Sequence, residues 1–244
     1  MSEFLPKTQI GTGFDEHLLD HVHLRNKIIH YIKSDECIGR FLKNGHYWQE
    51  WMFHYIKHFY VPHTNIIDLG GNIGTTTLLM SEVVSDDCKV FTFEPIYSDI
   101  LFKNIVDNHL TDRVTVYPYG VGNKIETLQM KPVHLTDNIN FGGVSIIRSL
   151  DHSDTSVSIP IVPLDHFHFE NVSLIKIDVE HMEIQVLEGC IDFIRRCKPT
   201  ILIETYQLDE VAQTNVFKEI MSLGYEIRVI SEGCHDYLMT IKTT

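Results

Sequence analysis

Hydrophobic and polar positions follow two different patterns along the 244-residue chain. Over residues 18–38 and again over 48–60, apolar side chains recur at helical spacing, which predicts two or three N-terminal helices. After Pro62, short runs rich in β-branched residues alternate with stretches of helical periodicity. This alternation is typical of βαβ units, in which helices cover both faces of a parallel sheet. We therefore expect an N-terminal helical arm over 1–60 and a doubly wound α/β domain over 61–244, packed as one compact unit.

The same pattern predicts the individual elements of the α/β domain. Runs that are apolar on both faces are expected to be buried parallel strands, with helices between them. The last two strands are joined by a connection too short for a parallel crossover, so the sheet should end in an antiparallel hairpin. The expected strands cover 65–69, 89–93, 114–118, 174–179, 200–204, 225–230 and 237–242, and the expected helices 75–84, 100–108, 183–195 and 211–223.

Residues 124–162 interrupt this alternation between the third and fourth parallel strands. They contain Gly142-Gly143, scattered polar residues and two short apolar runs. We expect an insertion that covers the site. Within it, residues 140–145 form either a flexible lid or an ordinary turn.

Composition and charge argue against several classes of protein. The chain has 33 acidic and 20 basic residues, a net charge of −13, so a surface that follows nucleic-acid phosphates is not expected. No apolar run is long enough to cross a bilayer, and the N-terminus lacks the features of a secretory signal. The five cysteines form no CxxC pair or zinc-like quartet, and the fifteen histidines join no ligand signature. We expect a soluble, cytoplasmic protein with reduced cysteines, no metal, and no nucleic-acid or membrane partner. The cysteines are Cys37, Cys88, Cys190, Cys197 and Cys234.

The most informative stretch runs from a predicted buried strand into a glycine-rich turn and then a helix. Its sequence over residues 66–74 is IIDLGGNIG. Doubly wound sheets bind ligands at this edge, where glycines let the backbone approach a ligand closely and the helix presents free N–H groups. The candidate binding residues of this turn are Gly70, Gly71, Asn72 and Gly74.

Two acidic residues favour a nucleoside with an amino-acid tail over a dinucleotide. The glycines do not follow the GxGxxG spacing that packs a pyrophosphate onto a helix. Asp68 would repel a pyrophosphate but suits the ammonium of a methionine moiety, directly or through water. Glu94, at the end of the second strand, can accept hydrogen bonds from both ribose hydroxyls. The predicted ligand is therefore S-adenosylmethionine. Gly120 and Val121, in the loop after the third strand, either hold its adenine or belong to a plain turn.

Three carboxylates are expected to converge at the carboxyl ends of two neighbouring strands. Asp178 and Glu180 alternate out of the fourth strand, and Glu204 ends the fifth. Crowded like charges raise at least one pKa, which helps a carboxylate to act as a general base, and they stabilise a cation. Asp178 is the first candidate for the base and His181 the second. Alternatively, these acids cap the following helix or pair with Lys176.

Separated blocks of the sequence occur in an order and spacing that chance rarely produces. They read IDLGGNIG over 67–74, FEP over 93–95, IKIDVE over 175–180 and PTILIE over 199–204. Over about residues 65–204 the chain thereby resembles the FkbM family of class I methyltransferases. The FEP block adds Pro95 to the candidate cofactor-binding residues. One position departs from the family, which usually has glycine where this chain has His181, so either the backbone differs there or an extra titratable group faces the site.

The resemblance implies a fold, a cofactor and an activity. The fold is a Rossmann-like, mostly parallel sheet of seven strands in the order 3-2-1-4-5-7-6, with strand 7 antiparallel. The cofactor is S-adenosylmethionine. The family usually methylates oxygen, so the expected acceptor is a hydroxyl of a small molecule or carbohydrate. The alternatives are an NAD-dependent oxidoreductase and a non-catalytic module that binds S-adenosylmethionine. A homodimer in which the N-terminal helices pack on a second copy is also considered.

Overall fold

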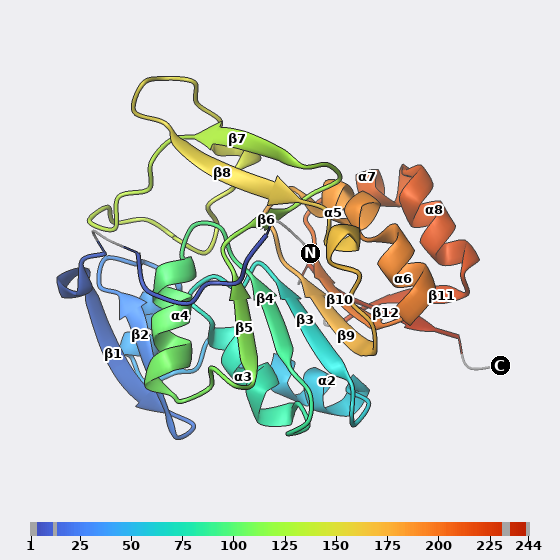
Figure 1. The fold of residues 1–244 in the computed structure, drawn as a ribbon, viewed down its shortest axis with the longest axis horizontal. Helices are drawn as coiled ribbons and strands as arrows, with labels where there is room; N and C mark the ends of the chain where they lie inside the picture. Colours follow the sequence, from blue (N-terminus) through green and yellow to red (C-terminus); the bar gives the residue numbers. More distant parts are fainter. Residues whose placement is uncertain (1–3, 12–13, 231–234, 243–244) are drawn as a thin grey trace.

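A seven-stranded sheet forms the centre of the protein (Figure 1). The computed structural model describes residues 4–11, 14–230 and 235–242. The first five strands in the order below are parallel, and β12 is antiparallel to both of its neighbours. This arrangement confirms the expected doubly wound fold with the order 3-2-1-4-5-7-6, in which β12 is strand 7. The strands lie in the order β5 (Val114–Tyr117), β4 (Val90–Phe93), β3 (Asn65–Leu69), β9 (Val172–Ile177), β10 (Thr200–Glu204), β12 (Asp236–Ile241) and β11 (Tyr225–Val229).

Helices cover both faces of this sheet because each central strand buries apolar side chains on both sides. Ile66 of β3 joins the core beneath one set of helices, and its neighbour Ile67 joins the core beneath the other set. The first set is α1 (Ile38–Lys43), α2 (Met52–Phe59), α3 (Thr75–Val83) and α4 (Ser98–Asp107), and the second is α5 (Glu183–Gly189), α6 (Ile191–Cys197), α7 (Leu208–Gln213) and α8 (Asn215–Ser222).

Two expected long helices are each divided in two. The helix predicted over 183–195 is interrupted at Cys190, and the one predicted over 211–223 is interrupted at Thr214. The Thr214 hydroxyl accepts the N–H of Phe217, an N-cap that starts α8 as a separate helix.

The N-terminal segment departs from the prediction. Residues 18–38 were expected to be helical, but β1 (Leu19–Leu24) and β2 (Lys27–Ile32) form an antiparallel hairpin there. Its two-residue turn, Arg25-Asn26, has φ angles of 50° and 58°, as a type I′ turn requires. The prediction is wrong because a short apolar run fits a half-buried strand as well as a helix, and the turn fixes the strand register. The helix expected over 48–60 is confirmed as α2.

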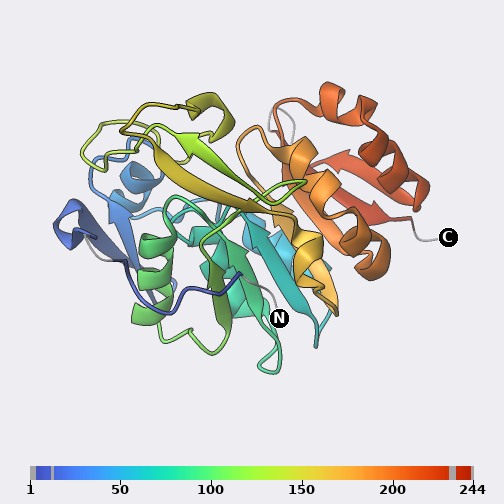
Figure 2. The same ribbon diagram turned by 45° about the horizontal axis from the view of Figure 1, so that its top comes forward.

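The segment between β5 and β9 forms a second, three-stranded sheet (Figure 2). Its strands are β6 (Gly120–Val121), β8 (Val157–Val162) and β7 (Glu126–Met130), in that order. Three short 3-10 helices complete the described structure: η1 (Glu16–Leu18), η2 (Ile147–Ser149) and η3 (Leu164–Phe167).

Four cysteines are free thiols: Cys37, Cys88, Cys190 and Cys197. Cys234, with the rest of residues 231–234 between the last two strands, lies outside the described residues. Within the described ranges, no helix has the length and apolar character needed to cross a membrane.

Candidate functional site

The glycine-rich turn brings the tips of β3 and β9 into contact. Gly70 has a φ of +82°, and a Cβ there would lie 1.7 Å from the carbonyl oxygen of Asp178. Only glycine therefore fits at this position. At Gly71, a Cβ would lie 2.3 Å from Thr92 Oγ1. Gly74, with a φ of +97°, is the N-cap of α3, so the turn passes directly into that helix.

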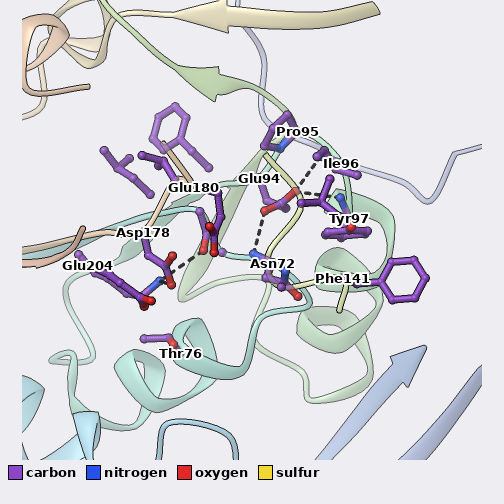
Figure 3. A pocket seen from close by; sticks show the side chains of 18 of the residues that line it. Asn72, Thr76, Glu94, Pro95, Ile96, Tyr97, Phe141, Asp178, Glu180 and Glu204 are labelled. Atoms are coloured by element: carbon purple, nitrogen blue, oxygen red, sulfur yellow. Dashed lines mark hydrogen bonds and ion pairs between the residues drawn. The ribbon is translucent and has the colours of Figure 1, made fainter. Parts of the chain in front are cut away.

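A cavity opens where this turn meets the carboxyl ends of β4, β9 and β10 (Figure 3). The N-terminal segment and the segment between β7 and β8 complete its wall. Three of the residues predicted from the sequence, Asp68, Gly74 and His181, do not line this cavity. The predicted residues that do line it are Gly70, Gly71, Asn72, Glu94, Pro95, Gly120, Val121, Asp178, Glu180 and Glu204.

Glu94 is held in the wall by three backbone groups. Its Oε2 accepts the N–H of Asn72 at 2.8 Å, and its Oε1 accepts those of Ile96 and Tyr97 at 2.7 and 2.9 Å. Burial raises the pKa of Glu94 to about 7, although these N–H donors lower it. A carboxylate has about four acceptor positions, so one remains on Oε2.

Asp68 lies beneath the turn rather than in the cavity. It is fully buried, and its Oδ2 accepts the hydroxyl of Thr77 at 2.6 Å. In the parallel register of β3 and β9, Asp68 is opposite Lys176, and 3.6 Å separates Asp68 Oδ1 from Lys176 Nζ. Burial raises the pKa of Asp68. Lys176, and not Asp68, lines the cavity, so a direct contact between Asp68 and a ligand's ammonium does not fit this geometry. The contact through water stays a prediction.

The alternative pairing of Asp178 is observed. Lys176 Nζ lies 3.1 Å from Asp178 Oδ2 and donates to the Gly70 carbonyl at 3.4 Å. Burial alone would lower the pKa of Lys176, but the charges of Asp178 and Asp68 raise it overall. A charged lysine therefore ties Asp178 to the glycine-rich turn.

Two further carboxylates share the cavity with Asp178. Burial, reinforced by the charge of Asp178, raises the pKa of Glu180 to about 7 and that of Glu204 to about 8. The structure thus brings together the three carboxylates that the strand pattern predicted at this edge. Both values lie in the range in which a carboxyl group can exchange a proton near neutral pH.

His181 retains the backbone conformation that glycine favours. Its φ is 74°, in the left-handed region, and its N–H donates to Glu183 Oε1 at 2.9 Å. The imidazole lies outside the cavity wall, with its centroid 6.5 Å from that of Tyr206. His181 therefore adds no titratable group to the described wall.

Tyr206 is a cavity residue that the sequence prediction missed. It lies two positions beyond Glu204, hence on the same side of the chain, and this spacing is the signal that could have found it. Burial and the charge of Glu204 raise the pKa of Tyr206 to about 12, and the ring lies 4.2 Å from that of His235. The side chain remains 58% exposed, so it stands at the mouth of the cavity. The other aromatic wall residues that were not predicted as site residues are Trp48, Phe93, Tyr97, Tyr119 and Phe141.

Residues 140–145 form part of the wall. Phe141 is fully buried and packs edge-on against Tyr97, with 6.1 Å between the ring centroids. Ser145 Oγ donates to the carbonyl oxygen of Glu180 at 2.7 Å. This hydrogen bond connects the segment between β7 and β8 to the backbone of Glu180, whose carboxylate lines the cavity.

The charges around the cavity favour a cationic ligand. The charged residues of its described wall are four acids and one lysine: Glu94, Asp178, Glu180, Glu204 and Lys176. Such a wall repels a pyrophosphate and stabilises a positive charge. Within the described ranges, no cluster of three or more histidine, cysteine or acidic side chains could hold a metal ion.

Comparison with known proteins identifies a family model and solved structures that the chain resembles. The family model of the methyltransferase FkbM domain matches residues 68–228. Among solved structures, the chain is similar to methyltransferase FkbM from Methylobacillus flagellatus KT, with a TM-score of 0.50 and 19% identity over 77% of this chain and 50% of that one. It therefore spans about half the length of that protein.

Two weaker likenesses are to proteins solved with a bound nucleoside. One is fibrillarin from Aeropyrum pernix with S-adenosyl-L-methionine, with a TM-score of 0.45 and 13% identity over 94% of this chain and 85% of that one. The other is a putative methyltransferase from Streptococcus mutans in complex with SAH. Its TM-score is 0.46, with 10% identity over 78% of this chain and 94% of that one. No curated protein matches the sequence. Because the family model covers more than half of the sequence, the chain belongs to the FkbM family of S-adenosylmethionine-dependent methyltransferases.

Proposed function

We propose that this methyltransferase transfers a methyl group to a hydroxyl oxygen of an uncharged small molecule or carbohydrate. The observation that carries the proposal is the pair Glu180 and Glu204, two cavity carboxylates with raised pKa values. An aliphatic hydroxyl is a poor nucleophile until a base removes its proton, and a base with a pKa near the working pH does this best.

The cavity residues fit S-adenosylmethionine, whose sulfonium supplies an electrophilic methyl group. Glu94 has an acceptor position left for a ribose hydroxyl. Pro95 and Val121 offer apolar surface for the adenine. Lys176 and Asp178 together offer a cation and an anion for the carboxylate and the ammonium of the methionine tail.

We assign the role of general base to Glu204 rather than to Asp178. Asp178 is already engaged in an ion pair with Lys176, whose Nζ lies 3.1 Å from Asp178 Oδ2. His181 lies outside the cavity wall. Glu204 has the higher of the two raised pKa values, and it lines the cavity. Glu204 would take the hydroxyl proton while the wall aligns oxygen, methyl and sulfur.

The charge and the aromatic rings of the wall support an uncharged, polar acceptor. Four carboxylates repel an acceptor that bears phosphate or carboxylate. We propose that a sugar stacks on the rings of Tyr206 and Trp48, which line the cavity.

The experiment compares matched acceptors with the purified protein and S-adenosylmethionine. Each neutral sugar or alcohol is assayed beside its phosphorylated and amino derivatives, and the methylated position is located by mass spectrometry. We expect O-methyl products from neutral acceptors, none from phosphorylated ones, and no turnover in Glu204→Gln. Methylation of nitrogen or carbon alone would refute the proposed acceptor. Calorimetric binding of NAD in place of S-adenosylhomocysteine would refute the cofactor assignment and favour an oxidoreductase, and cofactor binding without turnover on any acceptor would favour a non-catalytic module.

A further inference from the structure

Strand β11 ends the central sheet, opposite to β5 (Figure 1). In the described part of the chain, β12 is the one strand that pairs with it. The outer edge of β11 therefore presents backbone N–H and C=O groups that have no ladder partner within the described sheet. Such an edge is a template for pairing with another strand.

The hydrogen bonds that flank the β11–β12 ladder identify the residues that face outward. Ile230 N–H donates to Asp236 O, and Lys242 N–H donates to Gly224 O, each at 2.9 Å. Because hydrogen-bonded and non-hydrogen-bonded pairs alternate in an antiparallel ladder, the even-numbered residues of β11 bond to β12. The backbone groups that point outward belong to Tyr225, Ile227 and Val229.

The side chains between these residues are self-complementary. Glu226 and Arg228, both exposed, lie on either side of Ile227 on one face of the strand. If a second copy of β11 runs antiparallel about a two-fold axis at Ile227, Glu226 of each copy lies opposite Arg228 of the other. These are non-hydrogen-bonded pairs, in which facing side chains approach closest, and opposite charges there are favourable.

The other face of the strand is compatible with the same pairing. Val229, which is 48% exposed, would lie opposite Tyr225 of the second copy. Charges on an edge strand usually discourage pairing. The spacing of Glu226 and Arg228 disfavours pairing with most strands but favours antiparallel pairing with a second copy of β11.

We propose that two copies of this chain form a symmetric dimer by antiparallel pairing of their β11 strands about Ile227. The two sheets then become one continuous sheet, with the same surface used by both partners. This differs from the dimer considered from the sequence, which stays a prediction: Phe41 of α1 is 43% exposed, although other apolar residues of α1 and α2 are buried in their own subunit. Ile38, Leu42, Met52 and Ile56 are each at most 4% exposed.

Charge reversal with cross-complementation tests the proposal. The 244-residue chain is studied by sedimentation velocity from about 1 to about 100 µM, the range in which a moderate dimer dissociates. We expect a wild-type dimer, and we expect Glu226→Arg and Arg228→Glu each to weaken it by about tenfold or more, because each places like charges opposite each other twice. Mixing the two variants should restore the dimer, since one then carries two positive charges and the other two negative charges.

Restoration in the mixture also demonstrates that both variants are folded. Glu210→Arg, the same charge change on an exposed position of α7, is the matched control and should leave the dimer intact. A wild-type protein that is monomeric over the whole range overturns the proposal. A dimer that persists in both charge-reversal variants would also overturn the proposal, as would a mixture of the two variants that stays monomeric.

Discussion

Lys176 Nζ lies 3.1 Å from Asp178 Oδ2, at the point where the tips of β3 and β9 meet. The same ammonium lies 3.6 Å from Asp68, so one buried cation serves two carboxylates. Replacing Lys176 with Met would leave Asp68 and Asp178 without their cationic partner. We expect a loss of about 3 to 5 kcal/mol in the free energy of unfolding at neutral pH.

The loss of stability in Lys176→Met should depend on pH, because Asp68 is protonated in acid. Burial raises its pKa in the folded protein, so its favourable contribution is present in acid and is lost as the pH rises through the folded pKa. Lys176→Met should therefore be less destabilised in acid than at neutral pH, as measured by urea unfolding at several pH values. Lys124→Met, an exposed control, should change stability by less than about 0.5 kcal/mol. Equal losses at every pH would contradict the proposed role of Lys176.

Gly70→Ala should prevent the close contact between β3 and β9. A Cβ at this position would lie 1.7 Å from a backbone oxygen, and the loss of stability should exceed about 4 kcal/mol. Gly45→Ala is a matched control, because Gly45 has a similar φ of +79° but no atom within 4 Å of an added Cβ. The control should cost about 1 to 2 kcal/mol, the cost of the left-handed backbone alone. Thermal unfolding of the two variants measures the difference, and equal costs would show that the contact with Asp178 is unimportant.

The methyl-transfer rate should rise with pH to a plateau above about 8. A base acts in its deprotonated form, and the raised pKa of Glu204, about 8, delays that form to this range. The charge of Glu180 contributes to this raised pKa, so Glu180→Gln should move the midpoint of the profile to lower pH, whereas Glu204→Gln should abolish turnover. The profiles are measured as kcat/KM against pH with one acceptor. An unchanged midpoint in Glu180→Gln would exclude Glu204 as the titrating base.

Glu94→Gln should weaken cofactor binding by about tenfold or more, which corresponds to about 1.4 kcal/mol. An amide has one oxygen where the carboxylate has two, so its NH2 group would face N–H donors of Asn72, Ile96 or Tyr97. Calorimetry with S-adenosylhomocysteine measures the change. Glu210→Gln, on an exposed helix position, serves as the control and should bind normally. Normal binding by the Glu94 variant would remove this residue from the cofactor site.

His181→Gly should keep full activity and gain up to about 1 kcal/mol in stability, because the left-handed backbone no longer carries a side chain. His109→Gly, with a φ of 57° at the end of α4, should gain a similar amount. Thermal unfolding and the methyl-transfer rate are measured for both variants. A loss of activity confined to the His181 variant would restore the imidazole as a candidate base.

The sheet could be predicted because its signals are local. Each central strand is an apolar run with side chains buried on both faces, and a helix follows at regular spacing. The hairpin over 19–32 escaped because its runs are short and its periodicity is ambiguous. The division of the long helices escaped because it depends on single positions such as Thr214.

The site could be predicted in part for a related reason. The positions of Asp178, Glu180 and Glu204 follow from strand periodicity. The interior position of Asp68 does not, because it depends on the strand register that places this carboxylate opposite Lys176. The walls formed by Trp48 and Phe141 depend on distant segments folding over the sheet, which no local pattern reveals.

The hydrogen bond from Ser145 to the Glu180 carbonyl restricts how this enzyme can diverge. The segment between β7 and β8 is hydrogen-bonded to the stretch that carries Glu180, so we expect the exchange of that segment for a foreign one to shift this carboxylate as well. We therefore expect new acceptor preferences to arise more readily through replacements at exposed wall positions such as Tyr206 than through exchange of the whole segment.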